Sequence, residues 1–140
     1  MVLTSKIGRI AVARLPKGSD LLTEIERLAE ELNIKGALIT LIGALEKACF
    51  GIYVEGKYKK ITLNGPLEIV SCLGNIAVFN GKKVAHVHIA VSNTNGEVYG
   101  GHLLRGCIVN PTAEIIVIEG EKLELKREVD EETGLKLLIA

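Results

Sequence analysis

The segment from Ala85 to Val109 constrains the fold of this chain more than any other, because its pattern predicts two antiparallel strands joined by a turn. Apolar residues alternate with polar ones on both sides of Thr94–Gly96, and the glycine suits the left-handed position of a three-residue hairpin loop. Such a loop pairs Asn93 with Glu97. That pairing sets the register of the whole hairpin.

All three histidines of the chain, His86, His88 and His102, lie in this hairpin. The first two are two residues apart, so they project from the same face of a strand. The Asn93–Glu97 pairing places His88 opposite His102, and such cross-strand neighbours lie about 4.5–5.5 Å apart at Cβ. We therefore expect three imidazoles in one cluster. A bulge at Gly100-Gly101 would shift this register, whereas a close approach of another backbone there would preserve it.

One amphipathic helix is predicted near the start of the chain. Ser19 or Asp20 suits the N-cap position. Apolar residues then recur at helical spacing from Leu21 to Leu32, and the helix, of about four turns, is expected to end near Asn33 and Gly36.

The remaining apolar segments predict strands. An α+β fold (α/β sandwich-like) follows, with this main helix on a twisted, mostly antiparallel sheet of about seven strands. Because Ala37–Leu45 is nearly all apolar, we expect cover on both of its faces, and subunit association would supply what one helix cannot. The other strand candidates are Ile10–Leu15, Cys49–Val54, Tyr58–Leu63, Leu67–Val78, the two arms of the histidine hairpin, Thr112–Ile118 and Lys122–Val129, followed by an apolar tail at Leu135–Ile139.

Length and composition indicate a single globular domain, residues 1–140. The chain is 48% hydrophobic and 24% charged, which predicts a packed core rather than disorder. No apolar run reaches the roughly 18 residues of a membrane span, and the N-terminus lacks the pattern of a signal peptide. Cys49, Cys72 and Cys107 lie in apolar segments, as expected for buried thiols in a reducing compartment. We therefore expect a cytoplasmic protein without membrane contact.

Charge does not mark the chain as a free-standing DNA-binding protein. Seventeen basic residues balance seventeen acidic ones, and the sequence pI of about 6.8 differs from the basic value typical of such proteins. Lys57, Lys59 and Lys60 nevertheless gather around a predicted turn and are the candidate DNA contacts. The segment from Glu114 to Lys136 is acidic. Solvated surface is the simpler explanation of both segments.

Three segments resemble the plants and prokaryotes conserved domain, called the PPC domain: Lys17–Leu45, Gly65–Ile76 and His86–Cys107. The resemblance covers about Arg9 to Glu119, and the paired histidines of the hairpin are its specific part. It implies a homotrimer of α/β subunits. In plant members the domain follows AT-hook motifs in nuclear proteins that bind A·T-rich DNA, where it supports assembly and recruits transcription factors.

The resemblance also implies a partner-binding segment. Plant members carry Gly-Arg-Phe-Glu-Ile-Leu there, and this chain matches it at Gly65, Glu68 and Ile69 but has Pro66 and Leu67 in place of Arg and Phe. The chain also lacks an AT hook, the expected reader of the minor groove. Prokaryotic members are single-domain proteins often labelled DNA-binding. That label rests largely on the plant relatives, which is an argument from fold alone.

The histidine cluster is the strongest chemical signal. Three imidazoles with an open fourth position suit a catalytic zinc or another divalent metal, and some bacterial relatives are understood to hold a metal at the matching histidines. Histidines can also line a subunit interface without a metal. A metal enzyme would further need a general base and an oxyanion partner, for which Glu68, Glu97 and Arg105 are candidates by proximity in the sequence.

Three functions therefore remain open. The first is a DNA-associated or transcription-regulatory trimeric module that binds DNA or transcription-related proteins. The second is a metal-dependent enzyme or small-ligand binder that uses the three histidines. The third is a purely structural trimeric scaffold.

Overall fold

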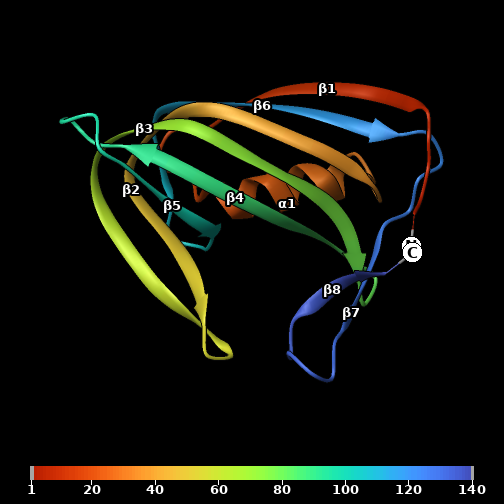
Figure 1. Ribbon diagram of the computed structural model, residues 1–140. Coiled ribbons are helices and arrows are strands. Elements are labelled where there is room, and N and C mark those ends of the chain that lie inside the picture. Colours follow the sequence, from red (N-terminus) through yellow and green to blue (C-terminus); the bar gives the residue numbers. More distant parts are fainter. Residues whose placement is uncertain (1, 140) are drawn as a thin grey trace.

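The structure, a computed structural model, describes residues 2–139 and is dominated by strands (Figure 1). One short helix lies under the sheet. The elements in chain order are β1 (Ile7–Leu15), α1 (Leu21–Glu31), β2 (Ala37–Val54), β3 (Lys57–Phe79), β4 (Lys82–Ser92), β5 (Val98–Leu103), β6 (Ile108–Gly120), β7 (Lys126–Val129) and β8 (Lys136–Ile139).

The strands form one mixed sheet in the order β1-β6-β2-β5-β4-β3-β7-β8. Every pairing is antiparallel except that of β3 with β7. The expected α+β class is confirmed in this form, although the fold contains more sheet than we predicted. The sheet has eight strands, one more than the expectation of about seven.

Strands β2 and β3 are longer than predicted because each joins two segments that the sequence pattern separates. Cys49–Val54 continues Ala37–Leu45, and Leu67–Val78 continues Tyr58–Leu63. The polar residues between them stay in the ladder, where Lys47 pairs with Asn64 across an irregularity in the register. Such an irregularity lets a strand bend and continue.

The additional β2–β3 pairing closes β2, β5, β4 and β3 into a ring. Phe50 of β2 pairs with Leu103 of β5, and Gly51 pairs with His102. The first half of β2 instead continues the open sheet through β6 to β1. In Figure 1 the β2–β3 hairpin and the β7–β8 hairpin extend toward the same side of the sheet, and Tyr53 Oη of one donates a hydrogen bond to Thr133 O of the other at 3.2 Å.

Helix α1 begins at an acidic cap and packs along β4. The Asp20 carboxylate accepts a hydrogen bond from Thr23 N at 2.9 Å, and the chain leaves the helix through Asn33, whose φ is 51°. Leu21, Ile25 and Ala29 are buried in the core. These bounds confirm the predicted helix and select Asp20 rather than Ser19 as its cap.

The first half of β4 has no strand partner on one side, and α1 caps this edge. Glu26 Oε1 accepts a hydrogen bond from Ala85 N at 3.2 Å, and Glu30 Oε1 accepts one from Lys83 N at 2.7 Å. Exposed edge amides invite pairing with another chain. Here two helix carboxylates occupy them.

One face of the open sheet is buried and the other is apolar but exposed. Val12 and Ile42 are 72% and 60% exposed, so a single chain does not give β2 the cover on both faces that its sequence predicts. We call this surface the outer apolar face; its residues are Ile10, Val12, Leu38, Ile42, Leu73 and Ile116. The register places these residues on the sheet face that also carries the histidines, because Leu73 pairs with His88.

Among residues 2–139, no helix is long and apolar enough to cross a membrane.

Candidate metal centre

Strands β4 and β5 bring the three histidines together as predicted. Asn93 N donates to Glu97 O at the turn, and the ladder below it pairs His88 with His102. Gly100 and Gly101 pair regularly with β4, so the register carries no bulge.

The glycines permit a close approach of β2 to the hairpin. A Cβ on Gly101 would lie 2.6 Å from Gly51 O, and Gly51 is the residue that pairs with His102. A side chain at Gly101 would therefore push β5 away from β2 beside the cluster. Close approach of another backbone was one of the two explanations that the sequence left open for Gly100-Gly101; the other was a bulge.

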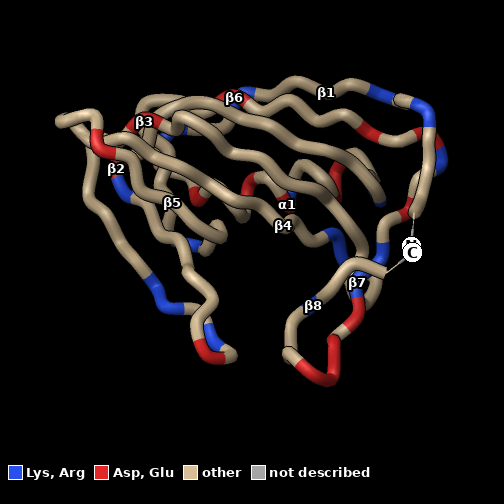
Figure 2. The backbone as a smooth tube through the Cα atoms, viewed as in Figure 1, with Lys and Arg blue, Asp and Glu red and all other residues tan. Residues whose placement is uncertain are grey.

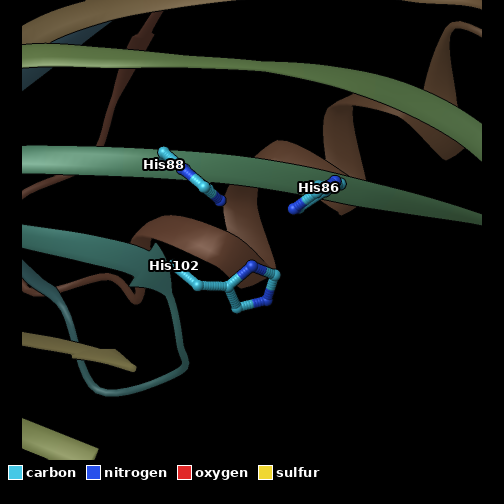
Figure 3. A group of neighbouring side chains, drawn as sticks. All are labelled: His86, His88 and His102. Atoms are coloured by element: carbon cyan, nitrogen blue, oxygen red, sulfur yellow. The ribbon is translucent and has the colours of Figure 1, made fainter. Parts of the chain in front are cut away.

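The three imidazoles turn toward a common point (Figure 3). One ring nitrogen from each of His86, His88 and His102 lies within 4.8 Å of the others. Zn–N bonds of about 2.0–2.1 Å put tetrahedral nitrogen ligands about 3.4 Å apart. Small rotations of the rings would bring the three nitrogens onto one ion.

Burial keeps two of these imidazoles neutral. Desolvation, with the positive charges of His86, His88 and Arg127, lowers the pKa of His102 to about 4. Desolvation and then the charge of Arg127 lower the pKa of His86. A metal binds neutral imidazole, so both groups are competent ligands at neutral pH.

His102 also carries an unpaired polar atom. Its Nδ1 is buried and has no hydrogen-bond partner among the described residues, and an unpaired buried nitrogen costs about 1–3 kcal/mol. A metal ion among the three rings would use such a lone pair. The residues present therefore fit a divalent metal with three histidine ligands.

A cleft of about 460 Å³ opens beside His86 and His102. Tyr58 of β3 stacks on His102, with ring centroids 4.7 Å apart and planes inclined by 22°. Residues Gly134–Leu137 of the β7–β8 hairpin form the opposite wall. The cleft is thus bounded by the Tyr58 ring and by Leu135 and Leu137 of the hairpin, with Lys136 between them.

Arg127 is the charged residue of the cleft that sequence reasoning missed. Its side chain reaches the cleft wall from β7 and is only 9% exposed. Arg127 donates from Nη1 to Lys136 O at 2.9 Å and from Nη2 to Asn75 Oδ1 at 2.7 Å, and Nη2 lies 3.4 Å from His86 Nδ1. In the sequence Arg127 stands between Lys126 and Glu128, so nothing distinguishes it from a surface residue.

Glu26 was missed for a similar reason, because it lies on the polar side of an amphipathic helix. It lines the cleft, and both carboxylate oxygens are engaged. Oε1 accepts from Ala85 N and Oε2 accepts from Arg105 Nη2 at 2.5 Å. Arg105, a candidate from the sequence, thus donates to Glu26, a residue of the cleft wall, and to Thr23 Oγ1.

The structure does not bring the other two catalytic candidates to the cluster. Glu68 is exposed on β3 opposite Ser92, further along the ladder than Leu73, which pairs with His88. Glu97 lies in the β4–β5 turn. Hydrogen bonds from Asn93, Tyr99 and Asn95 lower the pKa of its carboxyl.

The three candidate DNA-binding lysines, Lys57, Lys59 and Lys60, are exposed on the β2–β3 hairpin. Figure 2 shows positive charge along this hairpin and negative charge at the tip of the β7–β8 hairpin, where Asp130, Glu131 and Glu132 lie. The basic hairpin therefore projects to the same side of the molecule as an acidic one.

The segment matched to the plant partner site lies within β3. Ile69 is buried, so its side chain belongs to the core, whereas Glu68 is exposed. A Cβ on Gly65 would lie 2.5 Å from Leu45 O. Close packing of β3 on β2 thus accounts for Gly65 and Ile69.

The sequence profile of the Plants and Prokaryotes Conserved (PCC) domain matches residues 3–121, which include all three histidines. The chain belongs to this family. The profile ends before β7 and β8, so the hairpin that supplies Arg127 lies outside the matched residues.

Two solved structures have the same fold as this chain. A metal-containing protein from Archaeoglobus fulgidus is 36% identical, with a TM-score of 0.92 and coverage of 100% of this chain and 99% of that one. A plant- and prokaryote-conserved protein from Pyrococcus horikoshii is 33% identical, with a TM-score of 0.91 and coverage of 100% and 98%.

A curated relative places the domain in a larger protein. The bifunctional protein GlmU of Synechococcus sp. (strain JA-3-3Ab) is 30% identical over 127 residues, which make up 90% of this chain and 20% of GlmU. The chain thus spans about a fifth of the length of that relative.

Proposed function

We propose that this PCC-domain chain binds a divalent metal, with zinc as the first candidate, through His86, His88 and His102, and binds a small ligand in the adjoining cleft. The observation that carries the proposal is the convergence of one ring nitrogen from each of the three histidines; the buried and unpaired Nδ1 of His102 adds to it. The metal-containing relative from Archaeoglobus fulgidus supports it.

A zinc ion held by the three histidines would supply a Lewis acid beside the cleft. The chain's own residues would orient what binds there. Tyr58 holds His102 by stacking and offers an aromatic wall. Glu26 holds the edge of β4 and the Arg105 guanidinium, so it acts as a positioning residue rather than as a free base.

Metal analysis of untagged protein tests the proposal. We expect near-stoichiometric metal in the wild type after incubation with zinc and dialysis, and loss of that metal in a His86→Ala/His102→Ala variant. A Ser92→Ala variant, altered in the same hairpin but away from the cluster, should keep its metal. Wild-type protein that retains no metal would contradict the proposal and make these histidines structural.

We also propose that the chain forms a homotrimer through the outer apolar face. Exposed apolar patches of this kind mark association sites in soluble proteins, and a cyclic assembly covers the patch on every copy. The family resemblance supports a trimer. Light scattering would give three chain masses, and a monodisperse monomer at micromolar concentration would contradict it.

A second candidate function is association with DNA as a regulatory module. It is supported by Lys57, Lys59 and Lys60 on one exposed hairpin and by a relative from Ralstonia eutropha JMP134, described as a "putative DNA-binding protein", which is 29% identical with a TM-score of 0.83 and coverage of 92% and 90%. Backbone contacts by lysines make binding depend strongly on salt.

Titration of duplex DNA at two salt concentrations tests this candidate. We expect weakened binding and a smaller salt slope when Lys57, Lys59 and Lys60 are changed to Gln. The matched control changes Lys6, Lys17 and Lys122, three lysines outside the hairpin. No binding at low salt, or equal losses in both variants, would reject the hairpin as a DNA contact.

A further inference from the structure

Arg127 is a buried cation without an anionic partner in the part of the chain that the structure describes. Its donors contact only neutral acceptors, and its Nε is buried without any partner. Among residues 2–139, no carboxylate lies within ion-pair distance of it. Buried charges in proteins are usually paired or bound to a ligand.

The other charges of the cleft do not compensate Arg127. Glu26 is committed to Ala85 N and Arg105. Lys136, a further cation of the wall, holds its ammonium 4.4 Å from the Phe79 ring centroid. The cleft therefore carries positive charge even before a metal is bound.

Metal binding at His86 would leave one N–H donor of Arg127 without its acceptor. In the structure Arg127 Nη2 approaches His86 Nδ1 at 3.4 Å. If His86 binds a metal through Nδ1, that lone pair is used; if it binds through Nε2, Nδ1 carries the proton. In either case Nδ1 can no longer accept from Arg127, and the guanidinium faces the cleft with an unsatisfied N–H.

We propose that Arg127 makes this cleft an oxyanion site, in which a small organic acid places its carboxylate or phosphate group between Arg127 and the histidine cluster. The body of the ligand lies along Tyr58, Leu135 and Leu137, which supply aromatic and apolar walls. A charge-assisted hydrogen bond from a guanidinium to an oxyanion is among the strongest available to a protein. The inference deepens the proposed function and rests on it for the metal.

The experiment compares three probes that share a phenyl ring: benzoate, phenyl phosphate and neutral benzyl alcohol. Their affinities are measured by calorimetry and by amide chemical shifts, with the full chain both zinc-loaded and metal-free. We expect the two anions to bind zinc-loaded protein at least about tenfold more tightly than the alcohol. The tighter of the two anions identifies carboxylate or phosphate as the natural group.

Variants separate Arg127 from the metal. Arg127→Gln removes the charge and should weaken the preferred anion at least about tenfold, while zinc content stays at the wild-type level. Arg127→Lys keeps the charge and should retain part of the affinity, even if Arg127→Gln is less stable. Lys126→Gln removes the same charge from the exposed neighbouring residue on β7 and should change nothing.

The outcomes are distinguishable from those of the metal proposal. Absence of zinc binding with Arg127-dependent anion binding would support the oxyanion site and reject the metal. Zinc-loaded protein that binds no anion at millimolar concentration, or that binds it equally well in Arg127→Gln, would overturn the oxyanion site and leave the metal intact.

Discussion

His102 is the histidine of the cluster whose environment is best defined. Its ring is half-buried, stacks on Tyr58 and has no hydrogen-bond partner at Nδ1 among the described residues. Its ordinary pKa of 6.5 falls to about 4 in the folded chain. Between these values the unfolded chain binds more protons than the folded one, so folding stability is lost as the pH falls. Above pH 6.5 the residue is neutral in both states and contributes no pH dependence.

Urea unfolding of metal-free protein at several pH values measures this effect. The free energy of unfolding of the wild type should decrease from pH 7 toward pH 4 more steeply than that of a His102→Gln variant, which carries no titrating ring. Carboxyl groups that titrate in the same range are common to both proteins. Parallel curves would contradict the assigned pKa.

Gly101 sets the distance between β5 and β2 at the same site. In a Gly101→Ala variant the new methyl group would collide with Gly51 O at 2.6 Å and move His102. We expect a loss of stability of about 1–3 kcal/mol, typical of overpacking, and weaker zinc binding by competition with a chelator. Ser92→Ala, in the same hairpin, serves as the control and should retain both properties.

At the scale of elements, helix α1 depends on one carboxylate with two tasks. Asp20 Oδ1 accepts from Thr23 N, and Oδ2 accepts from Gly106 N at 2.6 Å in the loop after β5. Asp20→Ala should cost about 1–2 kcal/mol of unfolding free energy through loss of the cap. Asp20→Asn should cost less, and Ser19→Ala, whose hydroxyl bonds only Pro16 O, should cost least in thermal unfolding.

The elements that could be predicted from the sequence are those with local signals. The alternation of Val87, Ile89 and Val91 with the histidines predicted the hairpin. The turn at Thr94–Gly96 predicted its register. The long strands were not predictable in full, because their central polar residues stay in the ladder through long-range pairing, of Lys47 with Asn64 of β3 and with Ile108 of β6. Arg127 was missed because its burial depends on where β7 packs against the sheet, and the residues next to it in the sequence carry no signal of that position.

At the scale of the whole molecule, the outer apolar face is the largest feature that a single chain leaves unexplained. Val12 and Ile116 of this face pair across the edge strand β1 and its neighbour β6. A Val12→Glu variant should fold, because Val12 is exposed within the chain, yet reduce the mass in light scattering from that of a trimer to that of a monomer. The control Val54→Glu, an exposed valine on the β2–β3 hairpin, should leave the mass unchanged. A trimer that survives Val12→Glu would place the interface elsewhere.

The cleft is lined both by residues that the family profile matches and by residues beyond that match. The histidines lie within the residues that the family profile matches, whereas Arg127 and the β7–β8 wall lie beyond them. Under the two proposals above, the metal ligands and the oxyanion-binding Arg127 come from different segments of the chain. Grafting the β7–β8 hairpin of one relative onto another should therefore transfer ligand preference and leave metal binding at the histidines unchanged. In that case one metal site could serve different ligands through replacement of a short terminal segment.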